Sequence, residues 1–210
     1  AKLFASYGMD VWVWIGVGDI KNPADADREL DEQRRYFATF PVLDHVFVPG
    51  GDPGSNAPQD LLPFLARMAA MLRELHPKAK LWLSNQGFDH DQCDYLFSYL
   101  SENEPRWLAG LVFGPWTHIT LAETRARTPK HYPIRRYPDI CHSVRCEYPV
   151  SHWDRAFAFT LGREPFNPRP QAYAHIHNAL AKDSIGFISY SDGATDDVNK
   201  IVWNALAWDP

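Results

Sequence analysis

Short apolar segments that alternate with helical segments constrain the fold of this chain more than any other feature. The pattern predicts six β-strands, at residues 9–15, 43–48, 79–84, 108–113, 133–137 and 184–189. Strands that alternate with helices pair in parallel through crossover connections. The sequence therefore predicts an α/β fold built on a parallel sheet.

Helices are predicted between and after these strands from apolar spacing and capping residues. The clearest runs from Pro58 to Leu75, where Leu61, Leu65 and Leu72 share one face. Asp27 is the predicted N-cap of the helix that follows the first strand. The other predicted helices are residues 1–7, 28–38, 91–101, 121–127, 153–160, 171–181 and 196–206.

Two architectures carry such a repeat, a doubly wound open sheet and a (β/α)8 barrel. No Gly-rich dinucleotide fingerprint or phosphate-binding loop follows a predicted strand, which weakens the doubly wound alternative. Each strand ends in a polar or aromatic cluster, such as P-G-G-D, S-N-Q-G or Y-S-D-G, and a barrel gathers these clusters at one face. We expect residues 1–210 to form a partial TIM barrel of strands three to eight, with the first two βα units missing.

Composition excludes several classes of partner. The formal net charge of -5 gives no electrostatic footprint for nucleic acid. No run of 18 or more apolar residues is present, so no membrane span is expected. Eight Trp, nine Tyr and twelve Phe are mostly expected in the core, but aromatic rings also line sugar-binding clefts.

Carboxylates at the predicted strand ends suit the cleavage of a glycosidic bond. This reaction needs an acid for the leaving oxygen and a second group at the oxocarbenium-like centre. Asp52, in V-F-V-P-G-G-D-P-G, is the strongest candidate because proline and glycine hold it in a rigid turn. The alternative interpretation is an ordinary turn-forming aspartate. Asp139 and Asp192 are the candidates for the second catalytic carboxylate, and a structural salt bridge is the alternative for Asp139.

Other side chains at the strand ends are predicted to line a carbohydrate site. Trp116 follows a Gly-Pro at a strand end and suits an aromatic platform for a sugar ring. An arginine directed inward from residues 133–137 would hold the carboxylate of Asp139 ionised. The predicted substrate-binding residues are Trp14, Asn85, Gln86, Trp116, His118, Arg136 and Tyr190.

Metal and serine-nucleophile chemistry are not favoured. Cys141, His142, Cys146 and His152 are close in sequence but lack a tight metal-ligand spacing. No serine lies in a G-x-S-x-G motif. We therefore expect no metal and no cofactor. Asp196 and Asp197 are interpreted as acids that favour the start of the last helix.

The chain resembles bacterial (β/α)8 glycoside hydrolases from polysaccharide-degrading gene sets. The motifs that carry this resemblance are V-P-G-G-D-P-G, L-W-L-S-N-Q-G-F, V-F-G-P-W, P-I-R-R-Y-P-D-I-C-H, G-R-E-P-F-N-P-R-P and Y-S-D-G-A-T-D-D-V-N-K. It implies a glycosidase that acts on a carbohydrate and is secreted or periplasmic.

A second, weaker likeness is to the hexosaminidases of glycoside hydrolase family 20, whose fourth strand ends in Gly-Gly-Asp-Glu. Gly50, Gly51 and Asp52 match the first three positions, but Pro53 stands where that family has its acid. Family 84, with an Asp pair at the same strand, is half matched. The likeness implies an N-acetylhexosaminide substrate, with Asp52 as the acid or as the group that orients the acetamido substituent.

Two alternatives stay open at this point. The first is a non-catalytic carbohydrate-binding barrel, in which the carboxylates are too far apart or are held in salt bridges. The second is a metal-dependent barrel hydrolase. The separation of the carboxylates distinguishes the first alternative from a glycosidase, since catalytic pairs lie within about 10 Å of each other.

Overall fold

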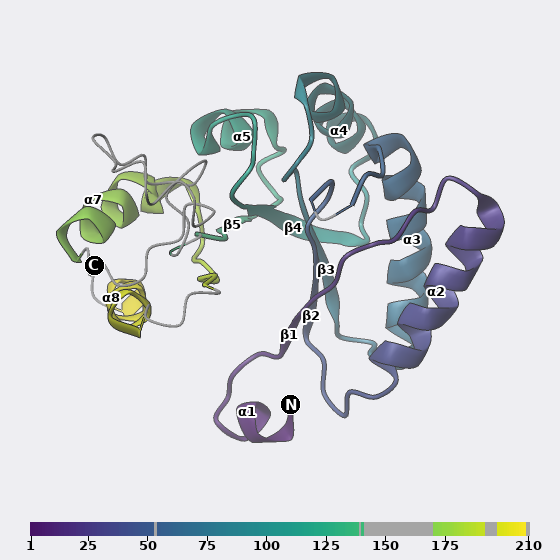
Figure 1. Ribbon diagram of the computed structural model, residues 1–210, viewed down its shortest axis with the longest axis horizontal. Helices are drawn as coiled ribbons and strands as arrows, with labels where there is room; N and C mark the ends of the chain where they lie inside the picture. Colours follow the sequence, from purple (N-terminus) through teal and green to yellow (C-terminus); the bar gives the residue numbers. More distant parts are fainter. Residues whose placement is uncertain (53, 139, 141–169, 192–196, 209–210) are drawn as a thin grey trace, which may run out of the picture. The chain divides into compact units, whose positions relative to one another are not determined.

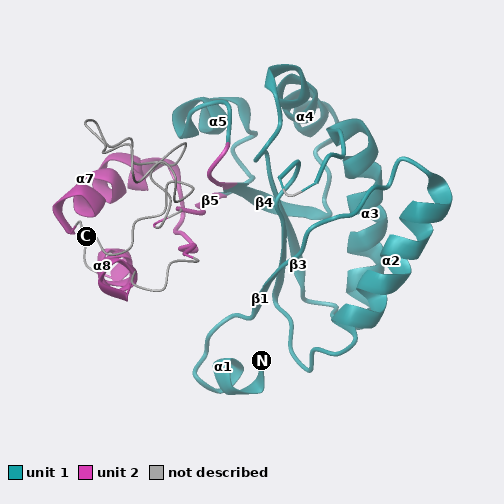
Figure 2. Cartoon of the chain, in the orientation of Figure 1, with its two compact units in different colours: residues 1–112, 117–133 teal, residues 113–116, 134–210 magenta. Residues whose placement is uncertain are grey.

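The computed structural model describes residues 1–52, 54–138, 140, 170–191 and 197–208. The chain divides into two compact units. Unit 1 comprises Ala1–Val112 and Thr117–Pro133, and unit 2 comprises Phe113–Trp116 and Ile134–Pro210. Figure 2 shows the two units in different colours.

The strands form one sheet in the order β1-β2-β3-β4-β5. Their bounds are β1 Trp12–Trp14, β2 His45–Val48, β3 Lys80–Ser84, β4 Leu108–Phe113 and β5 Ile134–Arg136. Neighbours from β1 to β4 pair in parallel, with one irregularity in register between Leu81 and Trp82. The predicted α/β fold with a parallel sheet is therefore confirmed, whereas closure into a barrel stays a prediction.

Unit 1 contains the helices α1 Lys2–Ser6, α2 Pro23–Phe37, α3 Pro58–Leu75, α4 His90–Asn103 and α5 Leu121–Arg127. No residue of α1 is buried, so this helix adds nothing to the core. α2 contacts α3 and α3 contacts α4, and Figure 1 shows α2 and α3 side by side. The apolar stripe of α3 is buried, with Leu61 and Leu65 fully inaccessible. In the strands, Val46 and Leu81 pair in register and are also buried.

The prediction for α2 was wrong at its N-terminus. The helix begins at Pro23, not at residue 28, because the side chain of Asn22 accepts a hydrogen bond from the backbone N–H of Ala24. A proline at the first helical position needs no intrahelical donor. Asp27 therefore lies inside the helix, where its carboxylate pairs with Arg67 of α3.

The face of the unit 1 strands opposite Val46 and Leu81 carries a row of aromatic rings. Trp12 stacks on His45 with ring centroids 4.1 Å apart. The indole N–H of Trp82 donates to Nδ1 of His45 at 3.0 Å. Nδ1 is thus an acceptor, which leaves the imidazole proton on Nε2, 3.2 Å from a carboxylate oxygen of Asp10. Trp82 is 4% exposed.

Unit 2 is built around a small aromatic core. It contains β5, α7 Pro170–Leu180, the 3-10 turn Ala181–Asp183 and α8 Asp197–Trp208. Ile140, Tyr173 and Trp203 are buried together, with Phe187 packed against them. The guanidinium of Arg136 lies 5.4 Å from the ring centroid of Trp203.

The sixth predicted strand, residues 184–189, is not a regular strand. It runs beside β5 through backbone hydrogen bonds, from Arg136 N–H to Gly186 O at 2.8 Å and from Ile188 N–H to Arg136 O at 2.9 Å. A single parallel bridge joins Arg136 and Phe187. Gly186, at φ 141, departs from the dihedral angles of a strand and limits the regular ladder.

None of the helices in the described ranges has both the length and the hydropathy of a membrane span.

Replacing Gly110 with alanine tests the packing of the aromatic face. A Cβ at this position would lie 2.4 Å from the Trp82 ring and 2.5 Å from the backbone oxygen of Pro133. We expect Gly110→Ala to lower the free energy of unfolding by about 1–3 kcal/mol, measured by urea denaturation. Gly18→Ala is the matched control, because its nearest neighbour is the end of the flexible Glu29 side chain. Equal effects of the two substitutions would contradict the packing described for Trp82.

His177 makes the stability of unit 2 depend on pH. Burial, and secondarily the positive charge of Arg136, lower the pKa of His177 below its ordinary value. The unfolded chain therefore binds the proton more readily than the folded chain, and stability is lost as the pH falls below about 6.5. Thermal unfolding followed between pH 7.5 and 5.5 should show a smaller decrease in Tm for His177→Gln than for the wild type. His175→Gln, at an exposed position of the same helix, should keep the wild-type pH dependence.

Candidate functional site

The loops that follow β2 and β3 are interlocked through their backbones. The N–H of Gly51 donates to the carbonyl of Gln86 at 2.8 Å. Gly50 has a φ of +84, and a Cβ there would lie 2.3 Å from the carbonyl oxygen of Ser84. Gly87 has a φ of +74, and its Cβ would lie 2.9 Å from Cβ of Asp52. Gly50 of the P-G-G-D motif and Gly87 of the next loop are thus required by the close approach of the two loops.

This interlock brings together two of the predicted site residues. Nε2 of Gln86 donates to Oδ2 of Asp52 at 3.3 Å. Asp52 is partly buried, and Gln86 is 6% exposed. The backbone N–H of Gln86 also donates to Oγ of the buried Ser84 at 3.0 Å. The carboxylate at the end of β2 is therefore oriented by a side chain from the end of β3.

Two buried amide oxygens lie at the end of β3 without a hydrogen-bond partner among the described residues. They are Oδ1 of Asn85 and Oε1 of Gln86. A buried acceptor left unpaired costs about 1–3 kcal/mol. Such groups in a folded protein require an explanation, for example a bound water or a ligand.

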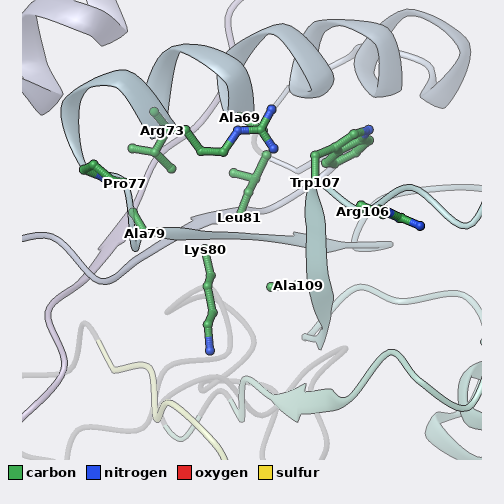
Figure 3. A pocket seen from close by; sticks show the side chains of 10 residues that line it. Ala69, Arg73, Pro77, Ala79, Lys80, Leu81, Arg106, Trp107 and Ala109 are labelled. Carbon is green, nitrogen blue, oxygen red and sulfur yellow. The ribbon is translucent and has the colours of Figure 1, made fainter.

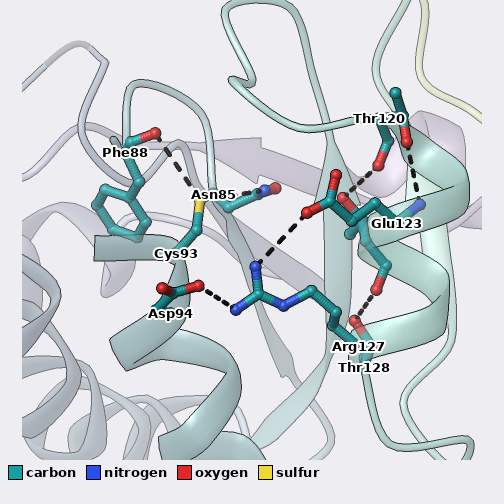
Figure 4. Close-up of polar contacts among 9 residues, drawn as sticks. Asn85, Phe88, Cys93, Asp94, Thr120, Glu123, Arg127 and Thr128 are labelled. Atoms are coloured by element: carbon teal, nitrogen blue, oxygen red, sulfur yellow. Dashed lines mark hydrogen bonds and ion pairs between the residues drawn. The ribbon is translucent and has the colours of Figure 1, made fainter. Parts of the chain in front are cut away.

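Asn85 points toward α4. Figure 4 shows it beside Cys93 and Phe88. Its Nδ2 lies 3.9 Å from Sγ of Cys93, whose thiol in turn contacts the carbonyl of Phe88 at 3.8 Å. Burial raises the pKa of the Cys93 thiol, although the bond from Asn85 opposes this shift. Asn85 is fully buried, and its predicted role in binding substrate stays a prediction.

Arg127 joins α5 to α4. Its guanidinium pairs with Asp94 and lies 3.7 Å from a carboxylate oxygen of Glu123 (Figure 4). It also lies 4.6 Å from the ring centroid of Phe97. The side chain of Thr120 accepts a hydrogen bond from the N–H of Glu123 and caps α5. The cap fixes the start of α5 at Leu121, three residues after the predicted site residue His118.

Asn56 is a buried residue that the sequence analysis missed. It is 2% exposed and ties the loop after β2 to the loop after β1. Its Oδ1 accepts from the N–H of Ile20 at 3.2 Å, and its Nδ2 donates to the carbonyls of Gly18 at 2.7 Å and Val17 at 3.3 Å. Asparagine is common in loops, so nothing in the local sequence distinguishes this one from a surface turn residue.

The remaining predicted residues of unit 1 lie on its surface. Trp14, the last residue of β1, is 46% exposed. His118 is exposed, and its ring centroid lies 6.4 Å from that of His90, the first residue of α4. His90 was not predicted as a site residue. The sequence signal that could have identified His90 is its position directly after Asp89, the N-cap at the end of the loop that follows β3.

Three of the predicted residues, Trp116, Arg136 and Tyr190, belong to unit 2. Trp116 is 40% exposed with a φ of 61, a backbone conformation that is strained for a side chain of this size. The ring of Tyr190 lies 5.6 Å from that of Tyr137. Arg136 is 1% exposed and packs against α8. The structure gives Arg136 a place in the core of unit 2, and a role in substrate binding stays a prediction.

The second catalytic carboxylate was predicted at Asp139 or Asp192, and both lie outside the described residues. The same holds for Asp196, for the predicted helix 153–160 and for the group Cys141, His142, Cys146 and His152. Asp197 begins α8, as an acid in its first turn. Within the described ranges, no group of three or more His, Cys, Asp or Glu side chains is placed to hold a metal ion.

A hollow in unit 1 lies at the opposite ends of the strands. It is lined by the end of α3 and the starts of β3 and β4, and includes Arg73, Lys80, Arg106 and Trp107. Figure 3 shows Lys80 directed away from the helix, on the other side of the strand from Leu81. The cationic groups diverge, so this hollow does not form a convergent anion site.

Comparisons with known proteins assign no family to the chain. No protein-family profile matches it, and no curated protein does. Two solved structures of β-glucuronidase from Bacteroides uniformis are similar, each with 12% sequence identity and a TM-score of 0.48. One of them is covalently bound to cyclophellitol-6-carboxylate aziridine. The similarity covers 90% of this chain but only 24% of each of theirs, and at this level it decides neither fold nor activity.

Asn56 is expected to hold the first two loops of the site together. Asn56→Ala removes three hydrogen bonds and leaves the buried N–H of Ile20 without its acceptor. We expect the free energy of unfolding to fall by about 1–3 kcal/mol in urea denaturation. Ser55→Ala, at the exposed neighbouring position, should change it by less than about 0.5 kcal/mol. A negligible effect of Asn56→Ala would show that the loops are held by other contacts.

Proposed function

We propose that this chain contributes to the catalytic barrel of a glycoside hydrolase that cleaves a glycosidic bond in a carbohydrate. The observation that supports this proposal is the placement of Asp52. Its carboxylate lies at the carboxyl end of β2, in a loop that two glycines lock against the loop after β3, and the amide of Gln86 orients it. The carboxyl ends of parallel strands are where α/β barrels and open sheets hold their ligands.

In this proposal Asp52 either donates a proton to the leaving oxygen or orients an acetamido substituent. Both roles need a carboxylate held to within fractions of an ångström, which the interlocked loops and Gln86 provide. The partner carboxylate is Asp139 or Asp192. A pair about 5 Å apart would retain the anomeric configuration, and a wider pair would invert it.

The proposed substrate is an N-acetylhexosaminide, with the exposed rings of Trp14 and Trp116 as platforms for the apolar face of a sugar. His118 and Tyr190 would supply polar contacts. An enzyme of polysaccharide degradation would act outside the bacterial cytoplasm, so we propose a secreted or periplasmic location.

The catalytic assignment is tested with Asp52→Asn and a panel of 4-nitrophenyl glycosides. The panel contains the N-acetyl-β-glucosaminide, the β-glucoside, the β-galactoside and the β-glucuronide, the last being the sugar class in the names of the two similar structures. General acid catalysis contributes about 10²–10⁴-fold, so kcat/KM for the best substrate should fall by that factor. Asp31→Asn, at an exposed acid within α2, is the matched control and should keep wild-type turnover.

Three results would contradict this assignment in different ways. Turnover by Asp52→Asn within a few-fold of wild type would remove Asp52 from the catalytic step. Sugar binding by the wild type without turnover of any glycoside would favour the non-catalytic alternative. Activity that is lost with a chelator and restored by zinc would favour the metal-dependent alternative.

A further inference from the structure

We propose that the amino ends of β3 and β4 form an anchoring surface for an acidic polysaccharide, a sugar polymer with carboxylate or sulfate groups along its chain. Lys80 begins β3 and Ser84 ends it, so this surface lies at the end of the parallel strands opposite to Asp52. It holds a polymer and breaks no bond, and therefore goes beyond the proposed hydrolase function.

Two adjoining hollows of unit 1 make up the anchoring surface. The first has a volume of about 120 Å³ and is lined by Arg73 and Trp107, among others. The second has a volume of about 360 Å³, and His131 is among the residues that line it. Arg106 and Ala109 line both hollows, so together these form an elongated depression rather than a single pocket.

Exposed cations gather at or beside these hollows, and their side chains form no ion pair or hydrogen bond with any described residue. They are Arg73, Lys78, Lys80, Arg106 and Lys130. On the helices, by contrast, Arg34 pairs with Glu74 and Arg67 pairs with Asp27. Among the described residues that line the hollows, Glu104 is the one acid. Cations grouped without counter-charges create a positive local potential, which attracts an anionic partner.

Helix dipoles explain one of these cations. Arg73 lies in the last turn of α3, where a positive charge is favourable. Lys80 is the first residue of β3, and Arg106 lies beyond Glu104, the C-cap of α4. Lys130 also lies outside the helices. The position of these three cations therefore needs another explanation, and an anionic partner supplies one.

The loops at the other end of the strands have the opposite charge. Residues 15–22, 49–57 and 85–89 contain the acids Asp19, Asp52 and Asp89 and one cation, Lys21. An acidic polymer is repelled there and attracted to the amino ends. The formal net charge of -5 thus conceals a charge difference between the two ends of unit 1.

The arrangement of the cations suits a chain rather than a single small anion. Lys80 is directed away from α3, on the other side of β3 from Leu81 (Figure 3). Diverging cations cannot converge on one phosphate or carboxylate, but they can meet acidic groups that are spaced along a polymer. The half-buried Trp107 lies among them and offers a ring for the apolar face of a sugar, which an acidic peptide does not have.

Calorimetric binding of chondroitin sulfate tests the anchoring surface, with dextran as the uncharged polymer and poly-L-glutamate as the acidic peptide. Wild type should bind chondroitin sulfate at least about tenfold more tightly than either of the other two polymers. The affinity should fall between low and physiological ionic strength, because salt screens exposed charges. A DNA duplex of similar charge density is the fourth probe and should bind more weakly than chondroitin sulfate.

Charge variants locate the binding at the amino ends. Arg73→Gln combined with Arg106→Gln should weaken chondroitin sulfate binding by about tenfold. Lys21→Gln removes an exposed cation at the other end of the strands and should bind as wild type does. Both variants should keep the wild-type urea midpoint, since the exchanged side chains are exposed.

Trp107→Leu separates the sugar contact from the charge contact. Leucine keeps an apolar side chain but removes the ring, so chondroitin sulfate binding should weaken by about three- to tenfold. Binding of poly-L-glutamate should stay unchanged. If this variant does not fold, the charge variants decide by themselves.

The proposal is overturned if wild type binds none of the polymers, or binds dextran as tightly as chondroitin sulfate. It is also overturned if the double arginine variant binds as wild type does. Tighter binding of poly-L-glutamate or of DNA would assign the surface to an acidic protein or to nucleic acid instead. Binding of chondroitin sulfate that depends on Arg73 and Arg106, in a chain that hydrolyses no glycoside, would support this inference and remove the proposed hydrolase activity.

Discussion

The close backbone contact between the loops after β2 and β3 determines the geometry of the candidate site. Gly50 faces the carbonyl of Ser84 at a distance that no Cβ tolerates, and Gly87 faces Asp52 in the same way. Both glycines have positive φ values, so the turns themselves also require this residue type. The hydrogen bond between Gln86 and Asp52 joins the same two loops.

The sequence predicted well those elements whose signals are local and repeated. α3 and α5 have the predicted bounds, because an apolar stripe or a clear cap marks each of them. The strand order follows from the βα alternation. The predicted start of α2 was wrong because Asn22 and Asp27 are equally good N-caps by residue type. Only the structure shows which of the two side chains accepts a hydrogen bond from a backbone N–H. The segment 184–189 was predicted as a strand from its apolar residues, although Gly186 interrupts the ladder.

The candidate site was predictable only in part. Asp52 and Gln86 could be placed at the same edge because parallel strands end there together. That the two side chains bond to each other depends on loop geometry that spacing does not encode. The role of Asn56 depends on contacts across more than thirty residues of sequence, and the glycines before Asp52 were open to two interpretations until the neighbouring loop was seen.

The contact between the two loops also limits which substitutions they can accept during evolution. A side chain introduced at Gly50 collides with the carbonyl of the other loop, and one introduced at Gly87 collides with Asp52 itself. A substitution at either glycine therefore disturbs the other loop as well. In relatives of this protein, glycine should therefore be kept at both positions, because each loop limits the residue that the other can carry.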